Sequence, residues 1–380
     1  MLRPKQFVWA HPQEPPYSDK AKPTKNAPAV DAEGRIYLCT QGRLLALAEQ
    51  DGKPKIEWEY VIGTHVPGPV VIGPEGNLRV HASDGCLHCI DPSGKQRWSP
   101  ADVGEPLGWA APVVDSRGNT YICAYDGGLL RIDGEGKAGR RAYYRSRRKF
   151  DSSAVVLEDV LLVGSEDGYV FAIQLDEDKG RSIWDHDADF GYAGGFINSA
   201  PAISADGGII VVAARDENLY GFAPNGAKAW NAKLPGQLLG SPVIGPAGHV
   251  YVGVSQAPRG EPAKGLLVCV DGNSHKIRWQ YAADGPIEST PVIGDDDLLY
   301  FGDNSGTIHA VDLQGKEKWK ARVETAVRSA GTILAPGRLA FGLDNDTVVV
   351  LDCSSGGLAQ RGWPKIGRNL SQSGLIEPAH

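Results

Sequence analysis

The feature that most constrains the fold of this chain is an internal repeat. A short apolar stretch recurs roughly every forty residues along the sequence. The eight occurrences are APAV (27–30), PGPVV (67–71), AAPVV (110–114), SSAVV (152–156), SAPAI (199–203), GSPVI (240–244), STPVI (289–293) and SAGTI (329–333). A repeat of this length indicates one array of similar units, although 380 residues would otherwise suggest two or three domains.

Each unit has the composition of four short strands. Residues 289–319 read STPVIGDDDLLYFGDNSGTIHAVDLQGKEKW, in which four apolar runs are separated by Gly, Asp and Asn. These are residues of tight hairpin turns, and no run has a helical period. The acidic run at 294–300 therefore reads as a turn rather than a calcium loop. We predict a single all-β domain over residues 1–380, an eight-bladed propeller of four-stranded antiparallel blades, with seven blades as the alternative.

The N-terminus supplies a strand without partners of its own. KQFVWAH (5–11) looks like the outer strands KIEWEY and KIRWQY, but no inner strands precede it. We expect it to pair with the last of the eight repeats (27–363) and so remove an open sheet edge. The C-terminal tail, 364–380, is expected to pack outside the ring.

Composition argues against two broad classes of protein. The net charge of −7 disfavours a protein that binds nucleic acid over its whole surface. The first residues have no apolar run before a small-residue cleavage site, and no stretch approaches the roughly 18 apolar residues of a membrane span. Six cysteines without an export signal suggest reduced thiols, so we expect a cytoplasmic protein and no membrane contact.

Several units resemble a known family. The segments CIDPSGKQRW (89–98), GFAPNGAKAW (221–230), CVDGNSHKIRW (269–279) and AVDLQGKEKW (310–319) resemble the tryptophan-docking motif of quinoprotein-like, PQQ-repeat propellers. The resemblance implies the propeller fold. The family includes PQQ- and calcium-dependent dehydrogenases, which typically carry adjacent cysteines, and outer-membrane assembly lipoproteins, which need a lipobox cysteine. The sequence has no Cys-Cys pair and no such cysteine near its start, so we expect neither PQQ nor Ca²⁺.

Cys86 and Cys89 form a C-x-x-C spacing with His88 between them and His81 upstream. Cys89 falls at the small-residue position of a third strand. Residues i and i+3 of a strand face opposite sides, so the two thiols cannot chelate one metal unless the strand breaks. We favour packing for both, and for Cys123, with a metal or redox site as the alternative.

The tryptophans require a similar choice. Seven of them fall at one position of the repeat, which indicates wedges between blades rather than a cofactor floor. They are Trp9, Trp58, Trp98, Trp184, Trp230, Trp279 and Trp319. Trp109 and Trp363 fall outside this position. Trp109 lies in a loop just before an inner strand, so a functional role is a stronger alternative for it than for the seven repeated tryptophans.

Three unequal loops could carry a binding site, because loops vary where the scaffold does not. GRRAYYRSRRKFD (139–151) interleaves cations with tyrosines in an acidic protein, which suits an acidic protein partner or, less well, nucleic acid. DHDADFGYAGGFINS (185–199) could be a partner loop, and SQAPRGEPAKG (255–265) a contact arm. The alternatives are a solvated outer strand and loop for 139–151, a plain connection between blades for 185–199, and a tolerated surface insertion for 255–265.

No Ser-His-Asp order, phosphate loop or HExxH motif is present, so we assign no catalytic residue and no metal ligand. The leading hypothesis is a non-catalytic interaction scaffold that uses the loop face. Its candidate residues are Arg141, Tyr143, Tyr144, Arg145, Arg147, Arg148, Lys149, His186, Phe190, Tyr192 and Phe196. The alternative is a ligand- or cofactor-binding propeller, an enzyme or a sensor. Its site would be the channel mouth, at His65, Trp109, Glu288 and Arg328.

Overall fold

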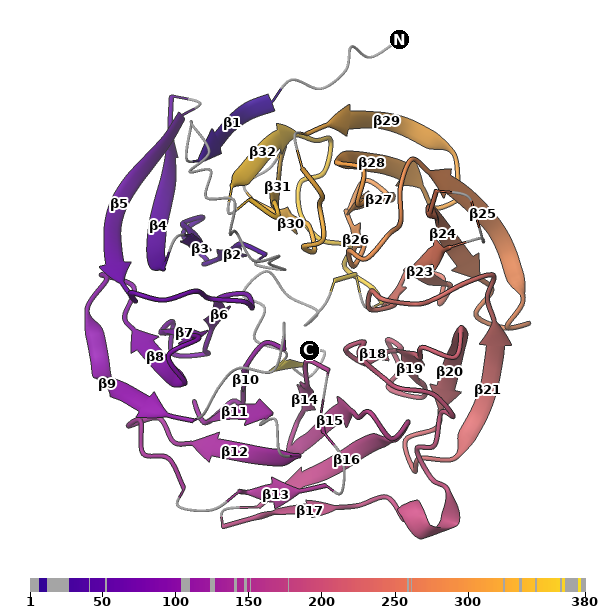
Figure 1. The fold of residues 1–380 in the computed structure, drawn as a ribbon, viewed down its shortest axis with the longest axis horizontal. Coiled ribbons are helices and arrows are strands. Elements are labelled where there is room, and N and C mark those ends of the chain that lie inside the picture. The colour runs from indigo at the N-terminus through magenta and orange to yellow at the C-terminus, as the bar shows by residue number, and fades with distance from the viewer. Residues whose placement is uncertain are drawn as a thin grey trace.

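The computed structural model is a ring of eight sheets around a central axis (Figure 1). It describes residues 7–11, 27–40, 42–51, 53–103, 110–123, 127–139, 142–146, 149–150, 152–176, 178–257, 260, 262–323, 325–334, 337–345, 347–362, 364–365 and 375–376. The predicted eight-bladed propeller of four-stranded antiparallel blades is confirmed. The one helix in this described part is a 3-10 turn, η1 (His186–Ala188). No helix of these residues is long and apolar enough to cross a membrane.

The strands are numbered along the chain, from the inner to the outer strand of each blade. Blade 1 has β2 (Ala29–Val30), β3 (Ile36–Thr40), β4 (Arg43–Gln50) and β5 (Lys53–Val61). Blade 2 has β6 (Val71–Ile72), β7 (Leu78–His81), β8 (Cys86–Ile90) and β9 (Gln96–Asp102). Blade 3 has β10 (Val113–Val114), β11 (Thr120–Cys123), β12 (Gly128–Ile132) and β13 (Tyr144–Arg145). Blade 4 has β14 (Val155–Leu157), β15 (Val160–Gly164), β16 (Val170–Leu175) and β17 (Gly180–Ser182).

The second half of the ring follows the same order. Blade 5 has β18 (Ala202–Ile203), β19 (Ile210–Ala213), β20 (Asn218–Phe222) and β21 (Lys228–Lys233). Blade 6 has β22 (Val243–Ile244), β23 (Val250–Gln256), β24 (Lys264–Val270) and β25 (Ile277–Ala283). Blade 7 has β26 (Val292–Ile293), β27 (Leu298–Gly302), β28 (Thr307–Asp312) and β29 (Glu317–Arg322). Blade 8 has β30 (Thr332–Ile333), β31 (Arg338–Gly342) and β32 (Val348–Asp352).

The N-terminal strand closes the ring, as the sequence predicts. β1 (Phe7–His11) pairs antiparallel with β32, with Trp9 opposite Val350. The pairing gives blade 8 its fourth, outer strand. It joins the two ends of the chain across one sheet and covers an edge that could otherwise pair with another chain.

The repeated tryptophans lie between neighbouring blades. At three of them the indole N–H donates to a backbone carbonyl in the next blade's turn between its third and fourth strands: from Trp58 to Pro92 at 2.9 Å, from Trp184 to Pro224 at 3.0 Å and from Trp279 to Leu313 at 3.0 Å. Each of these three rings also covers a glycine of that turn. A Cβ at Gly226, for example, would lie 2.6 Å from the ring of Trp184, so only glycine allows this approach.

A buried serine joins the inner end of four blades, 4, 5, 7 and 8, to the second strand of the same blade. Ser152, Ser199, Ser289 and Ser329 are buried, and the hydroxyl of each bonds to the backbone of a second strand. At Ser289 the Oγ donates to the Gly302 carbonyl at 2.7 Å and accepts from the Gly302 amide at 3.1 Å. One side chain thus satisfies two buried backbone groups.

We expect Ser289→Ala to lower the free energy of unfolding by about 1–3 kcal/mol, because the amide and carbonyl of Gly302 lose their partner in a buried position. Urea unfolding measures the change. Ser99→Ala on the exposed face of β9 is the control and should be close to neutral. Equal effects of the two substitutions would contradict this role of the hydroxyl.

The C-terminal segment differs from the sequence expectation. We expected residues 364–380 to pack outside the ring, but the described parts lie on its inner side. The amide of Ile293, on the innermost strand of blade 7, donates to the carbonyl of Pro364. β33 (Leu375–Ile376) pairs parallel with β14, the innermost strand of blade 4. The reason is that an innermost strand has one unpaired edge, which accepts a further strand.

Candidate functional site

The strongest local departure from the repeat is an insertion in the outer strand of blade 3. Lys95 precedes Trp98 by three residues, and Lys316 precedes Trp319 by three, whereas Lys137 precedes the aromatic Tyr143 by six. Ala138 forms a bridge with Ile132 and Tyr144 pairs with Leu129. The register between these two pairs is therefore irregular, because the outer strand has five positions between them and β12 has two. Bulges of this kind often mark functional sites.

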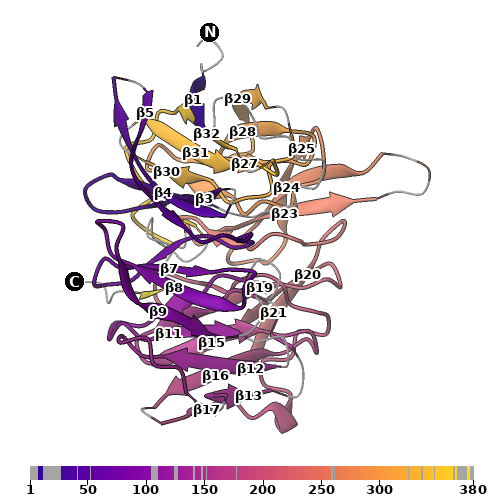
Figure 2. The same cartoon turned by 60° about the vertical axis from the view of Figure 1, so that its left-hand side comes forward.

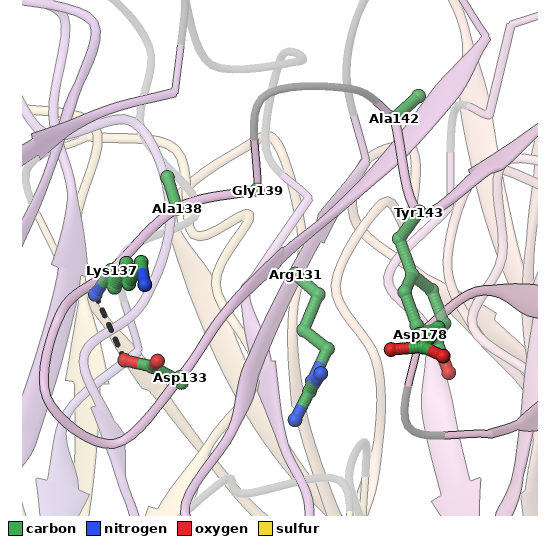
Figure 3. A pocket seen from close by; sticks show the side chains of 8 residues that line it. All are labelled: Arg131, Asp133, Lys137, Ala138, Gly139, Ala142, Tyr143 and Asp178. Atoms are coloured by element: carbon green, nitrogen blue, oxygen red, sulfur yellow. Dashed lines mark hydrogen bonds between the residues drawn. The ribbon is translucent and has the colours of Figure 1, made fainter.

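Beside this irregularity lies a pocket of about 460 Å³, within the usual size range of ligand sites (Figure 3). Its lining residues are Arg131, Asp133, Lys137, Ala138, Gly139, Ala142, Tyr143 and Asp178. They come from the end of β12, the turn after it, the bulge, and the corresponding turn of blade 4. The pocket therefore lies between blades 3 and 4, at their outer rim.

Arg131 forms part of the pocket for a reason visible in the repeat. In sibling blades this position of the third strand holds a small residue, such as Cys89 or Ala310, directly opposite the docking tryptophan. In blade 3 this position is Arg131, which pairs with Tyr121 of β11. Its Nη2 donates to Asn119 Oδ1 at 3.1 Å, and its guanidinium lies 6.0 Å from the centre of the Tyr143 ring.

Tyr143 takes over the wedge between blades 3 and 4. We placed it in the basic partner surface, but its side chain is buried, and its hydroxyl donates to the carbonyl of Asp176 in the next blade. Its ring packs on Tyr121 at 5.5 Å, much as Trp279 packs on Tyr251. Burial raises the pKa of Tyr143, so the hydroxyl stays protonated. Tyr143 therefore belongs to the core and the pocket wall, not to the exposed surface.

The charges in the pocket are not paired as they are in blades 6 and 7. In blade 7, Lys318 Nζ lies 2.8 Å from Asp312 Oδ2, and in blade 6, Arg278 makes the same kind of pair with Asp271 at 3.1 Å. Ala142 stands at the cation's position in blade 3. Asp133 Oδ1 caps its own turn by accepting from the amides of Glu135 and Lys137, and the carboxylate has no ion pair among the described residues.

The basic cluster divides into described and undescribed parts. Arg145 is exposed, Lys149 is half-buried, and Tyr144 packs on Phe150 and Phe171 with ring centres 6.3 and 6.0 Å apart. Arg141, Arg147 and Arg148 lie outside the described residues.

The 185–199 loop is better packed than its composition suggests. The ring of His186 lies 4.3 Å from that of Phe171, and Tyr192 lies 4.8 Å from Tyr169. Phe190 is half-buried, whereas Phe196 is 51% exposed. Of the four residues proposed in this loop, Phe196 is the one that presents a large apolar surface to solvent.

At the channel mouth, two of the four proposed residues meet. Arg328 Nε lies 3.4 Å from Glu288 Oε1, and Arg328 also pairs with Asp344. Asn304 Nδ2 donates to Glu288 at 2.6 Å. These polar groups bind one another at blades 7 and 8. His65 comes from the connection between blades 1 and 2, and Trp109 lies outside the described residues.

One metal-type cluster was missed because its members are spread over two blades. Ligand atoms of Asp284, Asp303 and His309 lie within 4.8 Å of one another. Asp303 already accepts from His309 Nε2 at 2.9 Å and from the Gly285 amide at 3.0 Å, and Lys320 pairs with Asp284 at 3.1 Å. Burial raises the pKa of Asp303, but hydrogen bonds from His309 and Ser305 lower it below the ordinary value. The arrangement is a satisfied structural network.

The C-x-x-C pair is built into the interior in the same way. Cys89 is buried, and Arg79 Nη1 donates to its Sγ at 2.8 Å. Burial raises the pKa of Cys89 to about 11, so its thiol is protonated at neutral pH. Cys86 is half-buried, and burial raises its pKa as well. Neither thiol has the lowered pKa of a reactive cysteine.

Comparison with known proteins places the chain in a family. The model of the family described as "Outer membrane protein assembly factor BamB" matches residues 172–257 and 215–363, which together span just over half of the chain. The chain belongs to this family. The expected resemblance to PQQ-repeat propellers is thereby confirmed.

Solved structures share the fold at low identity. BamB from Moraxella catarrhalis has a TM-score of 0.70 at 16% identity, covering 92% of this chain and all of that one. Sqt1 from Saccharomyces cerevisiae has 0.70 at 14%, covering 89% and 98%. Quinohemoprotein alcohol dehydrogenase from Comamonas testosteroni has 0.70 at 14%, covering 94% and 77%. These likenesses concern the fold alone.

One curated relative matches a short part of the chain. A "Desiccation/radiation resistance protein" of Deinococcus radiodurans is 33% identical over 99 residues, which is 26% of this chain and 17% of that protein.

Proposed function

We propose that this protein is a non-catalytic interaction scaffold that binds a protein partner on its loop face. This face is formed by the connections between the second and third strands of each blade and between one blade and the next. The observation that carries the proposal is Phe196, an aromatic side chain that is 51% exposed there. Aromatic side chains of this kind are the usual anchors of protein interfaces.

The backbone that carries Phe196 is held in place. Its carbonyl accepts from the amide of Arg215, and the next amide, of Ile197, donates to the carbonyl of Ser165. The side chain of Ile197 is fully buried. An exposed anchor on a fixed backbone binds at a lower entropic cost than one on a free loop.

Two further features of this face support the proposal. The strands β23 and β24, whose facing ends belong to the insertion at 255–265, extend beyond the disc (Figure 2). Gln237 pairs with Ser255 in both directions, at 2.9 and 2.8 Å, and so braces the base of this arm. Arg145 and Arg215 are exposed on the same face, which favours a partner with an acidic surface.

Relatives with the same fold supply a precedent. BamB is described as an assembly factor for outer membrane proteins, and its family includes this chain. The role of a relative with the same fold favours a scaffold function for this chain, but it does not identify the partner. The cytoplasmic location expected from the sequence stays a prediction.

The test compares two exposed apolar residues. Tagged wild-type protein is used to retain partners from native extract at low and moderate salt, alongside Phe196→Asp and Ile277→Asp. Ile277 is 39% exposed on the outer strand β25, away from the loop face. We expect a stoichiometric partner that is lost with Phe196→Asp, kept with Ile277→Asp, and weakened by salt. Equal retention by all three proteins, with unchanged melting temperatures, would contradict the proposal.

A further inference from the structure

The pocket of blade 3 results from coordinated departures from the repeat. Relative to blades 6 and 7, the blade has Arg131 in place of a small residue and Ala142 in place of the cation, and its wedge aromatic follows the turn lysine three residues later than the tryptophan does. The wedge function is preserved, because Tyr143 still bonds to the next blade. Tyr143 thus keeps the contact between the blades, and the pocket lies beside it at the rim.

The pocket is lined by charged side chains of both signs. Arg131 lines it beside the Tyr143 ring, and Lys137 stands at the rim. Asp133 lies near Lys137, and Asp178 comes from blade 4 on the other side of Arg131 (Figure 3). In the described part of the chain, the side chains of Lys137, Asp133 and Asp178 form no ion pair. Opposite charges within one cavity of this size suit a ligand that carries both charges itself.

Sibling blades show how one half of such a ligand would bind. There a lysine or arginine nitrogen lies about 3 Å from the aspartate that begins the same turn. An ammonium or guanidinium group of a ligand can take this place at Asp133. A carboxylate has its natural partner in an arginine, whose planar group forms paired hydrogen bonds with it.

We propose that the pocket between blades 3 and 4 binds a small zwitterion of the amino-acid class, a free amino acid or a dipeptide. The carboxylate is held by Arg131 and Lys137, and the cationic group by Asp133 and Asp178. Ala138, Ala142 and the edge of the Tyr143 ring contact the apolar part. The pocket lies at the end of the strands opposite the loop face, so this binding is independent of the proposed partner surface.

The first experiment uses matched ligands. Isothermal titration of the full chain is carried out with the free L-amino acids and with Gly-Gly, Gly-Lys and Lys-Gly. The best ligand is then compared with its N-acetyl form and its C-terminal amide. We expect saturable binding of at least one zwitterion, and a loss of about tenfold or more when either charge is blocked. Two results would overturn the proposal. One is the absence of binding at ligand concentrations up to about 10 mM, and the other is equal affinity for blocked and free ligands.

The second experiment locates the site. Lys137→Met and Asp178→Asn change exposed side chains, so the fold should be retained, as the melting temperature will show. We expect each to weaken the best ligand about tenfold. Lys316→Met is the matched control, because Lys316 occupies the same turn position in blade 7, where the tryptophan slot is filled. Unchanged affinity in both pocket variants, or an equal loss in the control, would show that the zwitterion binds elsewhere.

Discussion

Replacing Lys365 by methionine is expected to raise the free energy of unfolding at pH 7 by roughly 4 kcal/mol. Lys365 is fully buried on the inner side of the ring. Its Nζ donates to Thr332 Oγ1 at 2.9 Å, and that hydroxyl donates to the carbonyl of Pro28 at 2.8 Å. Burial lowers the pKa of Lys365 from 10.5 to about 7, and each pKa unit corresponds to about 1.4 kcal/mol. Methionine has a similar length and no charge to bury.

The same lysine makes stability depend on pH in a defined window. Between pH 7 and pH 10.5 the unfolded chain binds more protons at this residue than the folded chain. The free energy of unfolding therefore rises with pH across this window, and the stability present above pH 10.5 is lost as pH falls to about 7.

The measurement is denaturant unfolding of the wild type and Lys365→Met at several pH values. Their difference isolates this residue from the buried tyrosines and cysteines that titrate at high pH. It should be largest at pH 7 and shrink toward pH 10.5. A variant that is less stable than the wild type at pH 7, or a difference that is independent of pH, would show that Lys365 is not buried in its neutral form.

Replacing Trp184 by alanine is expected to lower the free energy of unfolding by about 4 kcal/mol. Trp184 is buried between blades 4 and 5, its N–H bonds to Pro224, and Gly226 lies against its ring. The substitution leaves a large cavity and a carbonyl without its donor. Unfolding in urea, followed by fluorescence of the remaining tryptophans and by circular dichroism, measures the loss.

Trp184→Phe is the graded control. It keeps an aromatic ring but loses the N–H and part of the volume, so we expect a smaller loss of about 1–2 kcal/mol. If alanine and phenylalanine have equal effects, or if neither is destabilising, Trp184 is not the wedge between blades that the structure indicates.

Much of the fold could be predicted from the sequence because the propeller is local and repetitive. Each blade is built from hairpins whose turns are marked by Gly, Asp and Asn. The pattern of one unit is weak evidence for a blade, but its recurrence in eight units makes the prediction strong. The N-terminal strand was predictable for the same reason, because KQFVWAH resembles the outer strands of other units but has no inner strands before it. The acidic run at 294–300 was a turn by alignment, and the structure places it between β26 and β27.

Prediction failed where a segment has no sibling to be compared with. Nothing in the sequence of Pro364, Lys365 or Leu375–Ile376 tells which sheet edge they meet, and only the tertiary structure places them inside the ring. The sequence indicates a surface residue at Tyr143 because its neighbours are arginines, whereas the structure buries it between blades 3 and 4.

The candidate sites show the same division. The sequence identified unequal loops, but which side chains of 185–199 are buried was decided by packing against Tyr169 and Phe171 of blade 4. The charged pocket was not predicted, since its residues come from a strand, a bulge and the next blade. The sequence by itself determined the number of blades and the wedges between them, because these depend on local period and turn chemistry. The tertiary structure alone decided the course of the tail and the assembly of the pocket, because both depend on contacts between residues that lie far apart in the chain.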